Sequence, residues 1–186
     1  MKTIVTAVSF VLVVACTPRE ATQQASSQDP AARGGYLAVI GGCDDCHTPK
    51  LMTPQGPVPD TTRRLSGHPA GERLPAFPGA VLGPDKWAAA ANNHLTAWAG
   101  PWGVSFAANL TPDETGMRAW TDSLFIVTMR TGKHMGSGRP ILPPMPYWSL
   151  AAMTDDDLKA LFAYLRTLKP VWNQVPTPLP PGGGGR

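Results

Sequence analysis

Residues 43–47 read Cys-Asp-Asp-Cys-His, and this pentapeptide is the stretch from which the fold is best predicted. Cys43 and Cys46 are three residues apart, so one helical turn places both sulfur atoms on the same face. That spacing, followed directly by His47, is the attachment signature of a c-type haem. In such a site the thiols form thioethers with one porphyrin edge, and the histidine provides an imidazole ligand to the iron. Because the motif occurs once, we expect a single, covalently attached haem c.

Other interpretations of the motif have less support. A structural zinc site needs four ligands, and the chain has no second cysteine pair. A thioredoxin-like redox pair needs a βαβ context, whereas glycine and proline surround this motif. A simple disulfide would leave His47 without a role.

The composition points to a single domain with long loops. The chain has 186 residues, which leaves little room for a second domain. It contains 19 glycines and 21 prolines. Together they are a larger fraction of the chain than the roughly 12% that these two residue types usually contribute. Long helices and regular sheets are therefore not expected. A formal charge of only +3 argues against nucleic acid as a partner.

The N-terminus has the pattern of an export signal. Lys2 precedes an apolar stretch over residues 4–15, which reaches only about 18 Å as a helix, too short for a hydrocarbon core of roughly 30 Å. Val-Val-Ala-Cys at residues 13–16 resembles the lipobox of bacterial lipoproteins, which implies removal of residues 1–15 and lipidation of Cys16. Thr17 in the next position then implies the outer membrane. The alternative is an ordinary signal peptide cut nearby.

The iron needs a second axial ligand, and Met145 is the main candidate. Prolines at positions 143, 144 and 146 fix the backbone around it, so this segment can hold a thioether against the iron. His134 and Met135 are the alternatives.

The other methionines and histidines have simpler expected roles. Met129 and Met153 are expected to pack in the core, and Met117 to lie in a polar turn. His68 and His94 are expected to be loop or surface histidines rather than ligands.

Three helices are predicted, over residues 33–42, 122–130 and 155–168. The last is the clearest, with Thr154 as N-cap, Pro170 as terminator and an apolar face formed by Leu158, Leu161, Phe162, Leu165 and Leu168. Residues 48–103 predict a long Pro/Gly-rich insertion with one short helix near 85–92. It is followed by an extended segment at 102–109. The tryptophans of residues 48–103 are expected to cover the porphyrin and the core; they are Trp87, Trp98 and Trp102.

Several motifs together resemble class I c-type cytochromes, in particular the cytochrome subunits of bacterial periplasmic alcohol, aldehyde, sugar and hydroxy-acid dehydrogenases. They are GGYLAVIGGCDDCHTPK (34–50), AANLTPDETG (107–116), MRTGKH (129–134), PPMPYW (143–148) and MTDDDLKALFAYLRTLKPV (153–171). The resemblance covers residues 33–172 and implies an all-α, cytochrome c-like fold in which the last helix crosses the first. The expected division is a signal peptide (1–15), a flexible tether (16–32), the cytochrome domain (33–172) and a disordered tail (173–186).

The resemblance implies an electron carrier rather than an enzyme. We expect a lipid-anchored protein in the periplasm that passes single electrons from a dehydrogenase toward the respiratory chain. Its partners would be a dehydrogenase, an oxidase or another cytochrome. Dehydrogenase subunits of this kind often carry three haem repeats, so a small carrier and a subunit role both stay open. The alternative function is a haem enzyme or ligand-binding module with an open sixth coordination position. Asn109, Trp120 and Arg130 are candidates to hold the haem propionates.

Overall fold

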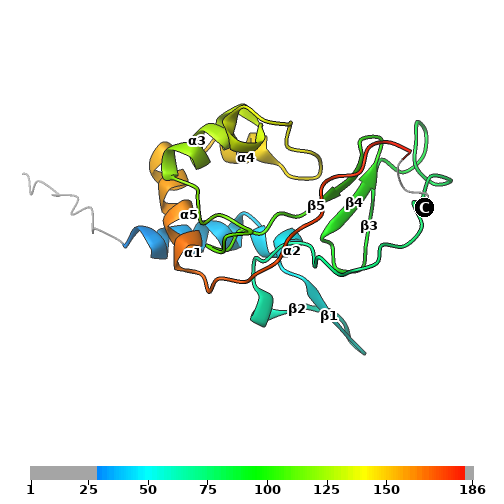
Figure 1. Cartoon of the computed structure of the whole chain (residues 1–186), viewed down its shortest axis with the longest axis horizontal. Coiled ribbons are helices and arrows are strands. Elements are labelled where there is room, and N and C mark those ends of the chain that lie inside the picture. The colour runs from blue at the N-terminus through cyan, green and yellow to red at the C-terminus, as the bar shows by residue number, and fades with distance from the viewer. Residues whose placement is uncertain (1–28, 183–186) are drawn as a thin grey trace, which may run out of the picture.

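The computed structural model describes residues 29–182, in which loops join helices and two small antiparallel sheets (Figure 1). The all-α expectation is therefore only partly right: the protein is mostly helical, but strands occupy the region between the second and third helices. The helices are α1 (Pro30–Ile40), α2 (Cys43–His47), α3 (Asp122–Thr131), α4 (Tyr147–Ala151) and α5 (Asp155–Thr167).

Side-chain caps set where the longer helices begin. The Asp29, Thr121 and Thr154 side chains accept hydrogen bonds from backbone N–H groups in the first turns of α1, α3 and α5. Because Asp29 caps it, α1 begins at Pro30, inside the stretch expected to be a tether. Gly132 ends α3 in a left-handed conformation at φ 63°, which favours glycine in this position.

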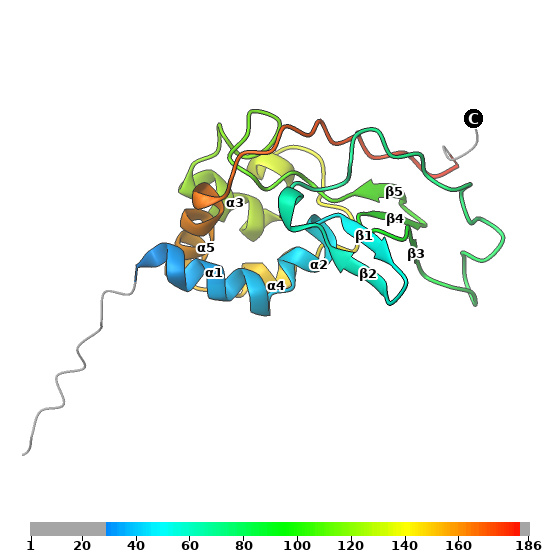
Figure 2. The same ribbon diagram turned by 90° about the horizontal axis from the view of Figure 1, so that it is seen from below.

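The first and last helices pack closely against each other, as the resemblance implied (Figures 1 and 2). The contact depends on Gly34, where an added Cβ atom would lie only 1.9 Å from the carbonyl oxygen of Ala160. Gly35 faces the ring of Tyr164 on the next turn of α5. Small residues on α1 thus allow the two backbones to approach.

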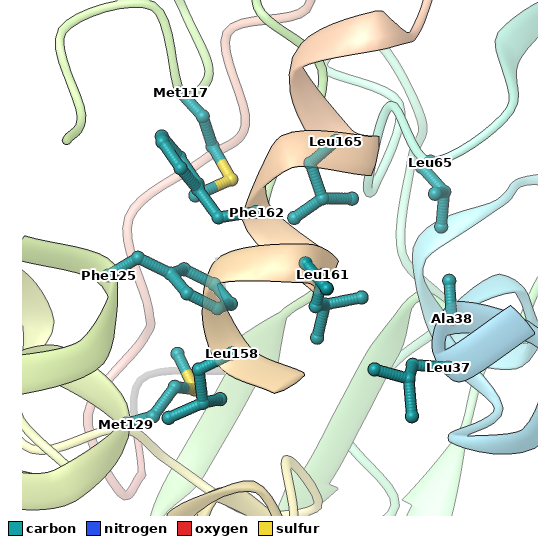
Figure 3. Packing of buried hydrophobic residues seen from close by; sticks show 11 residues of the cluster. Leu37, Ala38, Leu65, Met117, Phe125, Met129, Leu158, Leu161, Phe162 and Leu165 are labelled. Atoms are coloured by element: carbon teal, nitrogen blue, oxygen red, sulfur yellow. The ribbon is translucent and has the colours of Figure 1, made fainter. Parts of the chain in front are cut away.

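The apolar face of α5 forms the centre of the main core (Figure 3). Phe162 stacks on Phe125 of α3 with ring centroids 5.5 Å apart. Met129 is buried, as predicted. Met117 lies in a turn, as expected, but its side chain is buried beside Phe162. The buried members of this cluster are Leu37, Ala38, Leu65, Met117, Phe125, Met129, Leu158, Ala160, Leu161, Phe162 and Leu165.

The region between α2 and α3 has ordered structure of its own. It contains the hairpin β1 (Lys50–Thr53) and β2 (Gly56–Pro59), the short 3-10 helix η1 (Thr61–Arg63), and the sheet β3 (Ala90–Ala91), β4 (Ala97–Gly100) and β5 (Gly103–Phe106). Ala97, Ala99 and Val104 form a second small core in that sheet. β5 confirms the extended segment. The prediction of a short helix near residues 85–92 was wrong, because Asp85 has a positive φ of 58° and Ala90–Ala91 pair with β4.

Residues 168–182, the C-terminal segment, run from α5 back to the β3–β4–β5 sheet (Figures 1 and 2). The tail from residue 173 was expected to be disordered, but up to residue 182 it makes specific hydrogen bonds. Asn173 bonds to the backbone at Ser66, His68 and Ala70, and Leu179 pairs with Val104. Within residues 29–182 no helix has the length and apolarity needed to cross a membrane.

Candidate haem-attachment site

Helix α2 consists of the Cys-Asp-Asp-Cys-His motif itself. Gly42 precedes it with φ 65°, and a Cβ atom there would lie 2.9 Å from the Asp45 carboxylate. A left-handed residue in this position favours glycine and lets the chain turn sharply from α1 into α2. Cys43 and Cys46 are half-buried and not joined by a disulfide.

The geometry of His47 leaves one ring nitrogen available as a ligand. Its Nδ1 lies 2.8 Å from the carbonyl oxygen of Ala108. A carbonyl only accepts hydrogen bonds, so Nδ1 carries the proton and Nε2 keeps a lone pair. Burial lowers the pKa of His47, while the bond to Ala108 acts in the opposite direction. A neutral imidazole whose second nitrogen donates to a backbone carbonyl is typical of a metal ligand.

The two thiols are poor nucleophiles in this environment. Burial raises the pKa of Cys43 to about 11, and the nearby Asp44 charge adds to the effect. Burial and Asp45 also raise the pKa of Cys46. Redox-active cysteine pairs instead depend on a lowered thiol pKa, so the environment argues against the thioredoxin-like interpretation.

A partly buried ion pair braces α2 from the side. The Arg64 guanidinium donates to both carboxylate oxygens of Asp44, at 2.9 and 2.6 Å, and Thr48 donates to the same carboxylate at 2.8 Å. Burial raises the pKa of Asp44, but the bonds from Arg64 and Thr48 outweigh it, so the pKa lies below its ordinary value. The pair therefore holds the motif in a fixed position while neutralising one of its charges.

Lys50 braces the other end of the same helix. Its Nζ donates to the carbonyl oxygens of Asp44 and Asp45, at 3.0 and 2.9 Å, and to that of Thr48. Carbonyl groups at the C-terminal end of a helix lack partners within it, and a cation satisfies them well.

The residues around the motif fit a covalently attached haem. The donor set comprises two thiols on one helical turn and an imidazole with a free lone pair. Val39 and Ile40, the last two residues of α1, are 64% and 60% exposed although apolar. Such uncovered apolar side chains are suitable neighbours for an apolar porphyrin.

Met145 packs against the same apolar cluster as Cys43. It is half-buried, and its backbone carbonyl accepts a hydrogen bond from the Tyr147 N–H. The alternatives, His134 and Met135, are exposed in the short helix η2 (His134–Gly136), where His134 packs edge-on against Trp120. Met153 packs against the main core, as expected.

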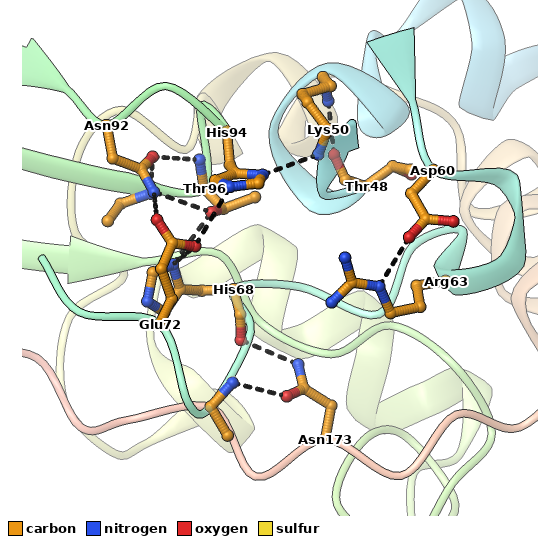
Figure 4. A network of polar contacts seen from close by, with 12 residues as sticks. Thr48, Lys50, Asp60, Arg63, His68, Glu72, Asn92, His94, Thr96 and Asn173 are labelled. Carbon is orange, nitrogen blue, oxygen red and sulfur yellow. Dashed lines mark hydrogen bonds and ion pairs between the residues drawn. The ribbon is translucent and has the colours of Figure 1, made fainter. Parts of the chain in front are cut away.

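A cluster of polar side chains around His68 adjoins the site at Lys50 (Figure 4). His68 lies in a loop, as expected, but it is not at the surface, because its side chain is fully buried and bonded to Thr96. His94 accepts a hydrogen bond from the backbone N–H of Lys50, and Glu72 lies 3.9 and 3.8 Å from the two imidazoles. Across residues 29–182, no group of three or more His, Cys, Asp or Glu side chains is placed to hold a metal ion.

Two of the three suggested propionate partners form hydrogen bonds within the protein. Asn109 bonds to Thr111, Thr115 and Val171, and the Arg130 guanidinium binds the backbone of residues 151 and 153 together with Asp155. Trp87, expected to cover the porphyrin, is 71% exposed. Cys16, expected to be lipidated, lies outside the described residues.

Three groups of the site were not identified from the sequence. The Ala108 carbonyl has no sequence signal, because any residue has a carbonyl. Arg64 is 20 residues from its partner Asp44. Lys50 could have been noticed as the cation nearest after the motif, but lysines are usually at the surface.

A comparison with models of protein families finds none that matches the chain. Curated proteins are similar, however. The cytochrome subunit of fructose dehydrogenase from Gluconobacter japonicus is 28% identical over 180 residues, which cover 93% of this chain and 29% of that protein. The cytochrome c subunit of gluconate 2-dehydrogenase from Pantoea cypripedii is 30% identical over 71% of this chain and 22% of that protein.

A nicotinate dehydrogenase subunit from Pseudomonas putida is 39% identical over 77 residues, 41% of this chain and 6% of that protein. The chain thus spans less than a third of the length of each of these relatives. The similarity confirms the resemblance stated from the motifs.

Proposed function

We propose that this chain transfers single electrons through one haem c attached at Cys43 and Cys46. It is a relative of the cytochrome c subunits of dehydrogenases, and those subunits are electron carriers. His47 and Met145 are the axial ligands in this proposal. The haem would supply the one-electron chemistry, and the protein would hold it in place.

The contact between His47 and the Ala108 carbonyl carries the proposal. At 2.8 Å it fixes the tautomer and directs Nε2 away as a ligand. The bonds of Arg64 and Lys50 to α2 hold the attachment helix rigid, so that little has to reorganise when the charge of the iron changes. Ligation by histidine and methionine is the arrangement that raises the potential of cytochromes c.

The electron donor in this proposal is a periplasmic dehydrogenase, and the acceptor belongs to the respiratory chain. The names of the relatives support the first assignment by analogy. The membrane location rests on Cys16, whose lipidation would confine the protein to the membrane surface, with Thr17 favouring the outer membrane.

Haem content and ligation test the proposal directly. The full chain is produced in a bacterium that matures c-type cytochromes, and haem is measured as its pyridine haemochrome. We expect one haem per chain, an oxidised spectrum with a far-red thioether-to-iron band, and no CO binding after reduction. A colourless protein would refute the proposal, and immediate CO binding would favour the ligand-binding alternative. The matched control replaces both Cys43 and Cys46 by Ala, which removes the attachment points.

A further inference from the structure

Lys50 is an almost buried cation next to the haem-attachment helix. Its residue exposure is 7%, and within residues 29–182 it forms no ion pair. An ammonium group has three N–H donors, and here three backbone carbonyls accept them. The site is therefore built for a charged lysine held in one position.

The charges around Lys50 do not cancel it fully. Asp44 is already paired with Arg64. Burial lowers the pKa of Lys50, whereas the carboxylates of Asp45 and, to a smaller extent, Asp44 act in the opposite direction. Asp45 is exposed, so water screens its charge more than that of Lys50. The end of α2 that bears His47 thus has a positive charge in a poorly solvated position.

We propose that Lys50 tunes the reduction potential of the haem, its buried ammonium favouring the reduced iron. The inference rests on the proposed function. Reduction adds one electron to the iron, and Lys50 keeps its proton in both states, so the effect is electrostatic. A positive charge in a medium of low dielectric constant stabilises the state with the additional electron. Lys50 acts through its field and touches no reacting atom.

The test is a spectroelectrochemical titration of the purified holoprotein and its variants. For Lys50→Gln we expect the equilibrium constant for reduction to fall about fivefold, which is roughly 40 mV for a one-electron couple. Lys50→Arg keeps the charge and should stay within about twofold of the wild type. Lys86→Gln is the matched control, because Lys86 is exposed and also donates to a backbone carbonyl, that of Ala80.

Asp45→Asn provides a second, independent arm with the opposite sign. It removes the exposed negative charge that faces Lys50, so the reduction constant should rise, by less than Lys50→Gln lowers it. If Lys50→Gln yields no holoprotein, Lys50→Met, which keeps the length of the side chain without its charge, takes its place in the titration. The inference is overturned if haem-loaded Lys50→Gln has the potential of Lys86→Gln, if Lys50→Arg falls as far as Lys50→Gln, or if Asp45→Asn lowers the reduction constant. A wild-type chain without haem would refute the proposed function as well.

Discussion

Replacing Gly34 by alanine tests the contact on which the packing of α1 against α5 depends. The new Cβ atom would lie 1.9 Å from the Ala160 carbonyl oxygen and 2.8 Å from the Cβ atom of Tyr164. Carbon–oxygen contacts are usually no shorter than about 3.3 Å. The two helices must therefore separate by about 1.4 Å at this point, because the nearest clashing atoms belong to the backbone.

The cost can be estimated from two opposing effects. Overpacking of this kind lowers the free energy of unfolding by about 1–3 kcal/mol. Because the backbone itself must move, we expect the loss for Gly34→Ala to be about 3 kcal/mol or more before any gain is counted. The substitution also removes a glycine from a helix, which recovers about 1 kcal/mol. We therefore expect a net loss of about 2 kcal/mol or more, which lowers the melting temperature of a domain of this size by about 4–8 °C.

Gly35→Ala is the matched control. Its Cβ atom would approach only the ring of Tyr164, at 3.3 Å, and a side-chain ring can shift by a few tenths of an ångström. The free energy of unfolding of this variant should be within about 1 kcal/mol of that of the wild type. The assay is denaturant unfolding of the holoproteins, followed by far-ultraviolet circular dichroism and compared by midpoint. Equal midpoints for the two alanine variants would show that the helices do not meet as described.

Four further results are expected. Met145→Ala should retain its haem but lose the far-red band and bind CO; a surviving band would point to His134 or Met135. Asn173→Ala should destabilise the protein by about 2–4 kcal/mol in the same unfolding assay, because buried backbone groups lose their partners, whereas the exposed Asn93→Ala should not. Hydrogen bonds from Thr62 and Arg63 lower the pKa of Asp60, so its stabilising effect is present at neutral pH. The difference in midpoint between wild type and Asp60→Asn should accordingly shrink as the pH falls below about 4, and a difference that persists at low pH would contradict this sign. Cys16→Ala should release the protein from membranes with unchanged spectra; continued membrane attachment would argue against lipidation.

Local patterns account for what was predicted correctly. The α3 and α5 boundaries follow from Thr121, Thr154 and Gly132, because caps act on residues within one turn. The same holds for the attachment motif, whose two sulfur atoms share a face through helical spacing alone. Met145 stays a prediction, because Met153 packs against the main core in the same way.

Burial and order that the sequence did not predict arise where contacts between distant segments override local character. Met117 is in a polar stretch, yet Phe162 of α5 packs against it. His68 is in a Gly/Pro-rich loop, yet it is buried beside Thr96, which is 28 residues away. The C-terminal segment has no helical or strand pattern, and Asn173 orders it through backbone groups more than 100 residues away.

The amino-acid sequence by itself determined the attachment motif, the main helices and the likeness to c-type cytochromes, because these depend on residue type and spacing within a few turns. Only the tertiary structure decided which backbone carbonyl orients His47, which arginine neutralises Asp44 and that Lys50 is buried. Those features need segments 20 to 61 residues apart to meet, or a charged side chain to be enclosed by its surroundings. Burial and chain crossing create such environments, and no short stretch of sequence encodes them.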